Sequence, residues 1–307
     1  MVSLAIGALL FVGDPAALAA SELSSFLGRP VASVAMHQLG KVRHASNEQG
    51  YVTIVADRKL FLLSAKEGLV ELPLRVPAGS AGFAYVRVAP SRQWAAFGDG
   101  EEKVALGSEK RLISLTGVGS AYFDANSTLV AVPSFERPLV PASETIAGMP
   151  IRMSPQPSLW TPSLSIGSTD SPSGLELDIK RGEKSEKCAT GPGYRPEWPN
   201  LNYSPISEGS GIVSRSSGNP DMVDCFVVSG SEGRSIVRGA YGAWSAFEGV
   251  AYLIEPKGSR LVNIATGKGM GWKSKWRAAW IPGSESALLF ELGGESTTAV
   301  VVTFSKK

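Results

Sequence analysis

The sequence predicts an all-β protein, and three observations support this class. Of its 307 residues, 34 are glycine and 20 are proline, which favours many short strands joined by turns. Long stretches with the polar and apolar pattern of a helix are absent. Short apolar segments that follow a turn recur about every forty residues, a period typical of the blades of a β-propeller.

The repeat is carried by six short apolar segments. They begin at Tyr51, Trp94, Leu129, Gly211, Gly249 and Ala287. The steps between them are 43, 35, 82, 38 and 38 residues, and the long step is close to two units. A further repeat is therefore expected between Ser154 and Arg181, which predicts seven blades of four antiparallel strands each.

The repeat units agree internally. The first unit contains four strand candidates, "KVRHAS", "YVTIVA", "KLFLLSA" and "LVELPL", which are separated by turn-forming pieces. The last unit contains only "WRAAWI", "ALLFEL" and "TAVVVTF" and lacks a fourth strand. The segment "VASVAM" (Val31–Met36) has no unit of its own, so we expect it to supply that strand and to close the ring.

The tryptophan-rich segment Gly271–Gly283, "GWKSKWRAAWIPG", fits two periods. Its tryptophans stand four residues apart, which fits one face of a basic aromatic helix or one face of a strand. The glycines that crowd its start disfavour the helix. We therefore predict two strands across a blade boundary, with Trp276 and Trp280 packed between blades.

Several local pieces resemble a known family. Val86–Gly100, Ala121–Ser134 and Ala278–Leu292 resemble the strand–turn–strand core of WD-repeat and related bacterial periplasmic propellers. Asn263–Gly271 resembles the hairpin that ends many such blades. No Gly-His or Trp-Asp dipeptide marks the blades, so the resemblance implies the architecture and no residue-level function.

The N-terminus resembles an export signal. An apolar run, Leu4–Val12, is followed by Ala17-Leu18-Ala19, which fits a signal-peptidase site, although no Lys or Arg precedes the run. The expected organisation is an export segment over residues 1–20 and a single propeller domain over 21–307. The expected location is periplasmic or secreted, or cytoplasmic if the segment is not a signal, and no transmembrane span is expected in the mature chain.

The two cysteines, Cys188 and Cys225, are a candidate disulfide if the chain is exported. By the chain-entropy estimate, a loop of about 37 residues closed this way is worth roughly 3–4 kcal/mol. The sequence contains no CxxC motif and only two histidines, His37 and His44. Neither a metal site nor a cofactor is therefore expected.

The charge balance excludes one class of partner. Lys and Arg total 30 against 28 Asp and Glu, a net charge of +2. This is too small for a protein whose main partner is nucleic acid.

A candidate binding loop spans Cys188–Asn200, where glycine and proline make the chain irregular. Tyr194, Arg195 and Trp198 in this loop are residue types enriched in binding hot spots. The alternative is a connector whose aromatic side chains cover a blade edge. The expected partner is another envelope protein, and a carbohydrate is a possible ligand.

No catalytic residue is assigned, because no GxSxG, Walker or HExxH motif is present. His44 has two interpretations, a general base near a propeller channel or a structural strand residue. Asp99, Glu101 and Glu102 also have two, a calcium loop or an Asp-Gly hairpin. The leading hypothesis is a non-catalytic cell-envelope propeller for protein binding or scaffolding. The alternative is a secreted hydrolase or lyase acting on a carbohydrate or lactone in the channel.

Overall fold

The computed structural model is described here for the following parts of the chain: residues 15–48, 50–78, 83–98, 103–133, 145–146, 148–153, 158–161, 164–171, 174–181, 184–189, 201–207, 210–216, 223–229 and 232–306. These parts contain one helix and 28 strands, which confirms the predicted all-β class. The strands form seven four-stranded sheets within the described residues.

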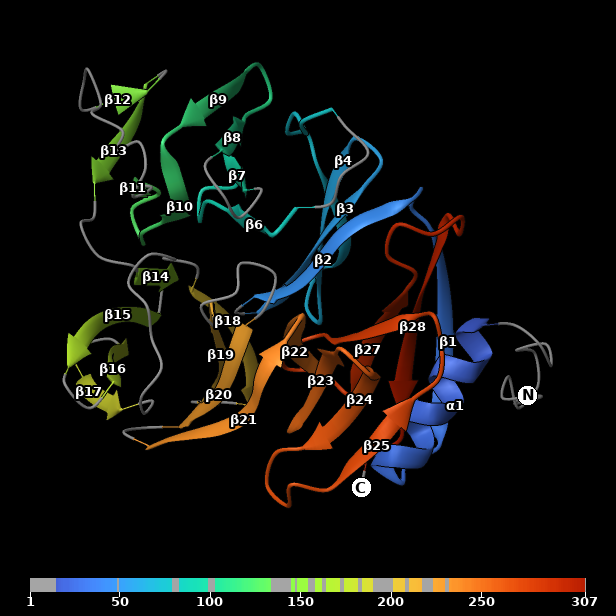
Figure 1. Ribbon diagram of the computed structural model, residues 1–307. Helices are drawn as coiled ribbons and strands as arrows, with labels where there is room; N and C mark the ends of the chain where they lie inside the picture. Colours follow the sequence, from blue (N-terminus) through green and yellow to red (C-terminus); the bar gives the residue numbers. More distant parts are fainter. Residues whose placement is uncertain are drawn as a thin grey trace.

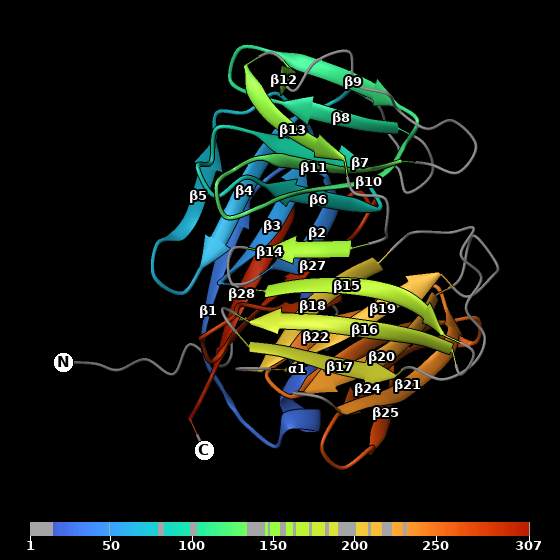
Figure 2. The ribbon, with the colours of Figure 1, turned by 90° about the vertical axis from the view of Figure 1, so that its left-hand side faces the viewer.

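Five sheets pair their strands in sequence order, and all their pairings are antiparallel. The first two are formed by β2 (Val42–Glu48), β3 (Tyr51–Ala56), β4 (Lys59–Ser64) and β5 (Gly68–Leu72), and by β6 (Tyr85–Val88), β7 (Ala95–Gly98), β8 (Lys103–Gly107) and β9 (Leu112–Thr116). The next is formed by β14 (Ser158–Thr161), β15 (Leu164–Ser171), β16 (Gly174–Arg181) and β17 (Lys184–Ala189), which lie side by side in Figure 2. The last two are formed by β18 (Leu201–Ser207), β19 (Ser210–Ser216), β20 (Val223–Ser229) and β21 (Glu232–Ala240), and by β22 (Gly242–Phe247), β23 (Val250–Glu255), β24 (Gly258–Asn263) and β25 (Gly269–Trp272).

Two sheets depart from this simple order. One consists of β10 (Val118–Phe123), β11 (Leu129–Pro133), β13 (Met149–Met153) and β12 (Thr145–Ile146), in that order. Its β11 and β13 run parallel, which corrects the expectation of antiparallel strands throughout. The other combines β1 (Val31–Gln38) with β28 (Thr298–Phe304), β27 (Ser286–Phe290) and β26 (Arg277–Trp280), so two ends of the described chain share one sheet.

The sheets stand around a common centre (Figure 1). Their innermost strands contact one another in turn, from β2 through β6, β10, β14, β18 and β22 to β26, and β26 contacts β2. This arrangement is a β-propeller. The exact number of blades and the closure of the ring stay predictions.

Apolar clusters fill the space between neighbouring sheets, because inner strands such as β3 and β7 bury residues on both faces. One cluster, for example, joins Val55 and Leu60 to Val86 and Phe97 between the β2–β5 and β6–β9 sheets. Another joins Val52 and other apolar residues of the β2–β5 sheet to the sheet of β26–β28. The strand segments predicted for the first and the last repeat unit form strands at those positions.

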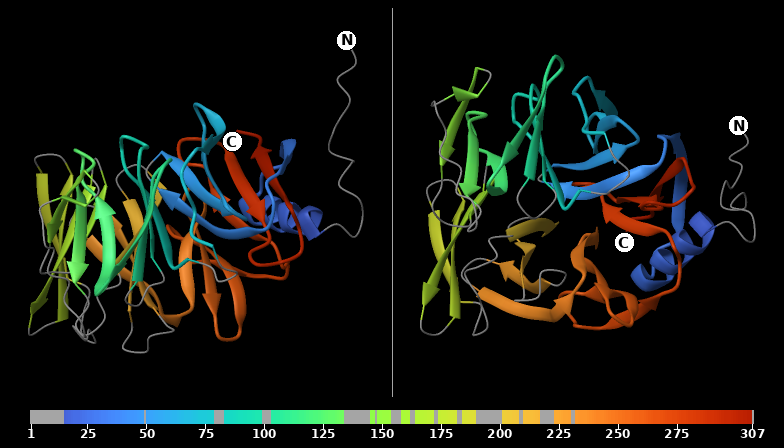
Figure 3. Two further views of the ribbon diagram at one scale, coloured as in Figure 1. Left: turned by 90° about the horizontal axis from the view of Figure 1, so that it is seen from above. Right: turned by 45° about the horizontal axis from the view of Figure 1, so that its top comes forward.

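A helix, α1 (Pro15–Leu27), precedes the strands and packs on the last sheet (Figure 3). It begins with a proline and ends before Gly28, whose φ of 62° suits a C-terminal cap. Its Ala19 and Leu23 are buried. The expected boundary after residue 20 falls inside this helix, and the export role of residues 1–20 stays a prediction. In the described part of the chain, no helix is long and apolar enough to cross a membrane.

The tryptophan-rich segment consists of strands joined by a bend, as predicted. Trp272 ends β25, and Trp280 lies in β26. Trp272, Trp276 and Trp280 are buried in one cluster with residues of α1, β22 and β28. The indole Nε1 of Trp272 donates to the carbonyl of Trp276 at 2.7 Å, which fixes the bend.

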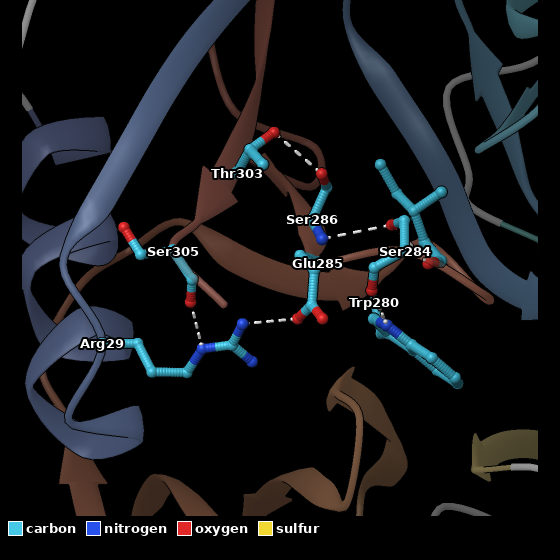
Figure 4. Close-up of polar contacts among 8 residues, drawn as sticks. Arg29, Trp280, Ser284, Glu285, Ser286, Thr303 and Ser305 are labelled. Carbon is cyan, nitrogen blue, oxygen red and sulfur yellow. Dashed lines mark hydrogen bonds and ion pairs between the residues drawn. The ribbon is translucent and has the colours of Figure 1, made fainter. Parts of the chain in front are cut away.

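Polar contacts hold the segment after α1 against the last sheet (Figure 4). Arg29 Nη2 lies 2.5 Å from Glu285 Oε2, and Arg29 Nε donates to the carbonyl of Ser305 at 2.6 Å. The guanidinium also lies 5.2 Å from the centre of the Phe247 ring. These contacts join the segment between α1 and β1 to residues that lie 276 and 256 positions away in the sequence.

Candidate functional site

Strand β2 carries polar side chains toward two different neighbours, because side chains alternate along a strand. His44 bonds to the carbonyl of Phe83, which leads into β6. Asn47 bonds to the carbonyl of Trp280 in β26 on the other side. We call the first group, His44, Ser46 and Glu48, the His44 site, and the second group the Asn47 network.

The imidazole of His44 is buried and holds one defined tautomer. Its Nδ1 lies 3.0 Å from the carbonyl of Phe83, and because a carbonyl only accepts, Nδ1 carries the proton. Burial lowers the pKa of His44 to about 4, although the bond to Phe83 raises it. The ring is therefore neutral near pH 7, and its unprotonated Nε2 can accept a hydrogen bond from Ser46 Oγ at 3.0 Å.

Glu48 continues the same row of side chains. Its Oε1 lies 3.4 Å from Ser46 Oγ. Burial raises the pKa of Glu48 to about 7, while Arg87 and the bond to Ser46 lower it. Ser46 has one hydroxyl proton, so it can donate to His44 or to Glu48 but not to both. When Glu48 is protonated, it can donate to Ser46, and the row from Glu48 through Ser46 to His44 is fully bonded.

Arg87 of β6 supplies a buried positive charge beside this row. Its Nη1 donates to the carbonyl of Ala121 at 2.7 Å and to Ser120 Oγ at 3.1 Å, both in β10. The guanidinium lies 4.3 Å from the centre of the Tyr85 ring. Burial lowers the pKa of Arg87, and Tyr85 and Glu48 raise it. Arginine stays charged in proteins. This cation therefore bonds β6 to β10 and acts electrostatically on Glu48 of β2.

Tyr85 supports Arg87 and depends on a glycine. Its hydroxyl accepts a hydrogen bond from the backbone N–H of Ala121 at 2.9 Å. The ring passes directly over Gly98, where an added Cβ would lie 2.1 Å from Tyr85 Cζ. Only glycine therefore allows the ring to reach this position.

Thr53 adds an unsatisfied polar atom near the His44 site. It pairs with Ser46 across β2 and β3 and is buried. Its Oγ1 has no hydrogen-bond partner among the described residues. A buried hydroxyl without a partner is uncommon, and it costs free energy relative to a satisfied one.

The Asn47 network joins the innermost strands of four sheets. Asn47 Nδ2 donates to the carbonyl of Trp280 in β26, and Asn47 Oδ1 accepts from Ser204 Oγ of β18 at 3.2 Å. Ser204 Oγ in turn accepts from the backbone N–H of Ser245 in β22 at 2.9 Å. All three side chains are buried, and their shared polar atoms are satisfied within the network. Strand β2 also contacts β18 and β22 across the centre.

The chemistry open to the two groups differs. In the His44 site, a third group orients the imidazole, and the unprotonated Nε2 bonds to a serine hydroxyl. This is the arrangement that activates a nucleophile. The low pKa of His44 weakens it as a base, since a general base works best with a pKa near the operating pH. Among the described residues, no group of three His, Cys, Asp or Glu side chains could hold a metal ion.

The sequence-predicted binding residues Tyr194, Arg195 and Trp198 lie outside the described residues. Asp99, Glu101 and Glu102 of the acidic loop lie outside them as well. The two interpretations given for each segment therefore stay open. His37 lies on β1, in a different sheet from His44, so the two histidines form no common site.

The predicted Cys188–Cys225 disulfide is not supported. Cys225 is a free thiol, 0% exposed, in the third strand of its sheet, where it packs among Ile212, Ala240 and neighbouring apolar residues. Cys188 lies on β17, the outermost strand of the preceding sheet. Burial raises the pKa of Cys225 to about 12, so the thiol behaves as a small apolar side chain. The cysteines are about one repeat apart in the sequence, so they lie in adjacent sheets. They are not on equivalent strands, because β17 is the fourth strand of its sheet and Cys225 lies on the third strand of the next.

His44 stands out in the sequence, but its neighbours Ser46, Glu48 and Arg87 do not. The alternating polar residues of "HASNE" were the available signal, because positions 44, 46 and 48 share one face of a strand. Arg87 had no such signal, since its neighbours come from another sheet.

No family model matches the chain, and no curated protein matches it. Among solved structures, the β-propeller domain of Cps50 (Swd1) from Myceliophteria thermophila is similar over 90% of this chain and 99% of its own, with 11% identity and a TM-score of 0.44. The β-propeller domain of the Trilobed protease from Pyrococcus furiosus is similar over 82% of this chain and 89% of its own, with 13% identity and a TM-score of 0.39. Hsv2 from Kluyvelomyces marxianus is similar over 83% and 90%, with 10% identity and a TM-score of 0.40. Likeness at this level carries no inference about function, and the propeller architecture of this chain rests on its own sheets.

Proposed function

We propose that this propeller is a non-catalytic protein-binding or scaffold module of the cell envelope. The observation that supports this function is the Asn47 network, in which Asn47, Ser204 and Ser245 bond to one another and to the backbone near the centre. Side chains that hold four sheets together are not free to bind a substrate there. Recognition is then left to the loops and edges of the sheets, which are the surfaces that protein partners use.

The proposed recognition element is the loop that contains Tyr194, Arg195 and Trp198. Tyrosine, tryptophan and arginine dominate the energy of many protein interfaces, and the prolines of this loop reduce the entropy lost on binding. The proposed partner is another envelope protein, and a carbohydrate is the second ligand class. The envelope setting rests on the signal-like sequence of residues 1–20.

A pull-down from an envelope extract tests this proposal. The wild type is compared with the double variant Tyr194→Ala and Trp198→Ala, and each protein is checked by a thermal melt. We expect the variant to lose partner capture at an unchanged melting temperature, since truncating a hot-spot aromatic typically costs about 2 kcal/mol or more, roughly thirtyfold in affinity. Equal recovery by both proteins would remove these residues from the binding site. Cell fractionation separately tests the envelope location.

A second candidate function, a hydrolase that acts on a carbohydrate or lactone, is favoured by one observation. Ser46 Oγ lies 3.0 Å from the unprotonated Nε2 of His44, whose orientation is fixed by Phe83. Such a serine would attack an acyl carbon while the imidazole takes its proton. The burial of His44 and its low pKa make this the weaker proposal.

A fluorophosphonate probe and a lactone panel test the hydrolase candidate. Labelling of Ser46 and lactone cleavage, both lost in Ser46→Ala, would support it. A wild type that is neither labelled nor active from pH 5 to about 9, a range that keeps His44 neutral and spans the titration of Glu48, would contradict it.

A further inference from the structure

We propose that β1 is a docking edge, at which an extended peptide segment of a partner protein adds as a fifth strand to the sheet of β26, β27 and β28. This inference rests on the proposed protein-binding function and names the surface and the kind of ligand. It does not involve the loop of Tyr194 and Trp198, so the two proposals can fail independently.

Strand β1 is the outermost strand of its sheet. It pairs with β28 along one side, from Val31 to Gln38. Its other side pairs with no strand among the described residues. Helix α1 contacts β27 and β28, so it packs on the sheet rather than along this edge. The outer N–H and C=O groups of β1 therefore offer a template for strand pairing.

The other outer strands of the described sheets are short or carry charges, which discourages pairing with another chain. Strands β9, β12 and β25 have five, two and four residues. Strand β5 contains Glu71, paired with Lys59, and β17 and β21 each contain lysine or arginine together with glutamate. Strand β1 has eight residues, "VASVAMHQ", with no Lys, Arg, Asp, Glu or Pro. It alone among these described edges combines length with the absence of charge.

The apolar cluster beneath the sheet reaches this edge and ends in an exposed side chain. Met36 is 65% exposed, although its partner across the ladder, Val300, is only 2% exposed. Val34, on the same face of β1, packs against the cluster that contains Val300 and Val302. An added strand would place a side chain beside Met36 and extend this cluster by one row.

The size of the edge selects a peptide over a second copy of the chain. A stable interface between two folded proteins uses about 20–30 residues on each side, whereas β1 offers eight residues. Strand addition by a peptide needs only a short edge, because main-chain hydrogen bonds supply much of the affinity. The expected ligand is an extended segment without proline or charge in the paired run and with an apolar side chain at the position next to Met36.

The experiment uses the full chain and a displayed library of random twelve-residue peptides. Peptides selected on the wild type are synthesised and titrated against three proteins: the wild type, Met36→Lys and Leu112→Lys. Leu112 is the matched control, because it is 44% exposed and begins the outer strand β9. A lysine at Met36 puts an unpaired charge into the new row of side chains, as natural edge strands do to prevent pairing.

We expect Met36→Lys to weaken binding at least tenfold and Leu112→Lys to leave it unchanged, at equal melting temperatures. Hydrogen exchange should show protection of the β1 amides when the peptide is bound. A second edge variant, Ala35→Lys, tests the opposite face of β1 in case Met36→Lys alters folding, and it should weaken binding too.

Three results would overturn the docking edge. The first is a failure to select any peptide. The second is equal binding by all the variants, with protection away from β1. The third is protection of β1 that depends on protein concentration without peptide, which would assign the edge to a second copy. A partner captured through Tyr194 and Trp198 would leave the protein-binding function standing in each of these cases.

Discussion

The two faces of β2 build two different kinds of polar contact from neighbouring residues. Toward β26, Asn47 forms a neutral network whose atoms all belong to amides, hydroxyls and the backbone. Toward β6, His44 and Glu48 titrate, and Arg87 adds a buried charge. The neutral face contains no titratable side chain, whereas the titratable face changes its bonding with pH. Adjacent residues of one strand can therefore separate structural and pH-sensitive roles.

The largest expected effect is on the neutral face. Asn47→Leu leaves the Trp280 carbonyl and the Ser204 hydroxyl without Asn47 as partner, and all three residues are at most 6% exposed. Each unsatisfied buried group costs about 1–3 kcal/mol, so we expect the free energy of unfolding to fall by about 2–4 kcal/mol. Urea denaturation measures this change. Ser46→Ala, on the opposite face, is the matched comparison and should cost less. A loss of less than about 1 kcal/mol for Asn47→Leu would mean that the network is not structural.

A smaller effect is expected from the support of Arg87. Gly98→Ala forces the Tyr85 ring away from its position, because the new Cβ would lie 2.1 Å from Tyr85 Cζ. Overpacking of this kind costs about 1–3 kcal/mol. Gly271→Ala is the control, since an added Cβ there meets nothing within 4 Å. Equal melting temperatures for the two variants would show that the ring and Arg87 are not held as described.

The titratable face should make the free energy of unfolding depend on pH. The pKa of His44 is lowered from 6.5 to about 4, so between these values the unfolded chain binds more protons and stability rises with pH. The pKa of Glu48 is raised from 4.5 to about 7, so the folded chain binds more protons there and stability falls as pH rises. The two slopes oppose each other between about pH 4.5 and 6.5, where each is at most about 1.4 kcal/mol per pH unit.

Single variants separate these slopes. We expect Glu48→Gln to make stability rise with pH between about 4 and 6.5, and His44→Gln to make it fall between about 4.5 and 7, each relative to the wild type. Chemical denaturation at a series of pH values measures both. Asn47→Leu should lower stability without changing the slope. Parallel pH curves for all the proteins would contradict the titratable character of this face.

The smallest expected effect is on the reactivity of Cys225. Its thiol is buried and its pKa is raised to about 12, so a thiol reagent should label it only when the protein opens. Ser204 of the neutral network lies in the same sheet as Cys225, so Asn47→Leu should accelerate labelling more than Gly98→Ala at matched stability. Mass spectrometry of the Cys225 peptide gives the rate. A thiol that stays unlabelled in unfolded, unreduced protein would instead favour the disulfide.

Much of the fold was predictable because its signals are local. The strand segments of the first unit, such as "YVTIVA", and the placing of Trp280 in a strand follow from alternation and turn residues over a few positions. The pairing of Val31–Met36 with β28 was predictable because the last unit lacked one strand. The parallel pairing of β11 with β13 was not, since it depends on how a long connection returns to the sheet.

The candidate site was only partly predictable, for the same physical reason. The sequence by itself determined that "KVRHAS", which contains His44, would form a strand, although β2 extends further, to Glu48. Only the tertiary structure decided that Asn47 meets Ser204, 157 positions away, and that Arg87 meets Ser120 in the next sheet. It also decided that Cys225 is enclosed among apolar side chains while Cys188 lies on an outer strand. Alternation and turns act between neighbours in the chain, whereas contacts between sheets are set by how the strands stack around the centre, which no short stretch of sequence specifies.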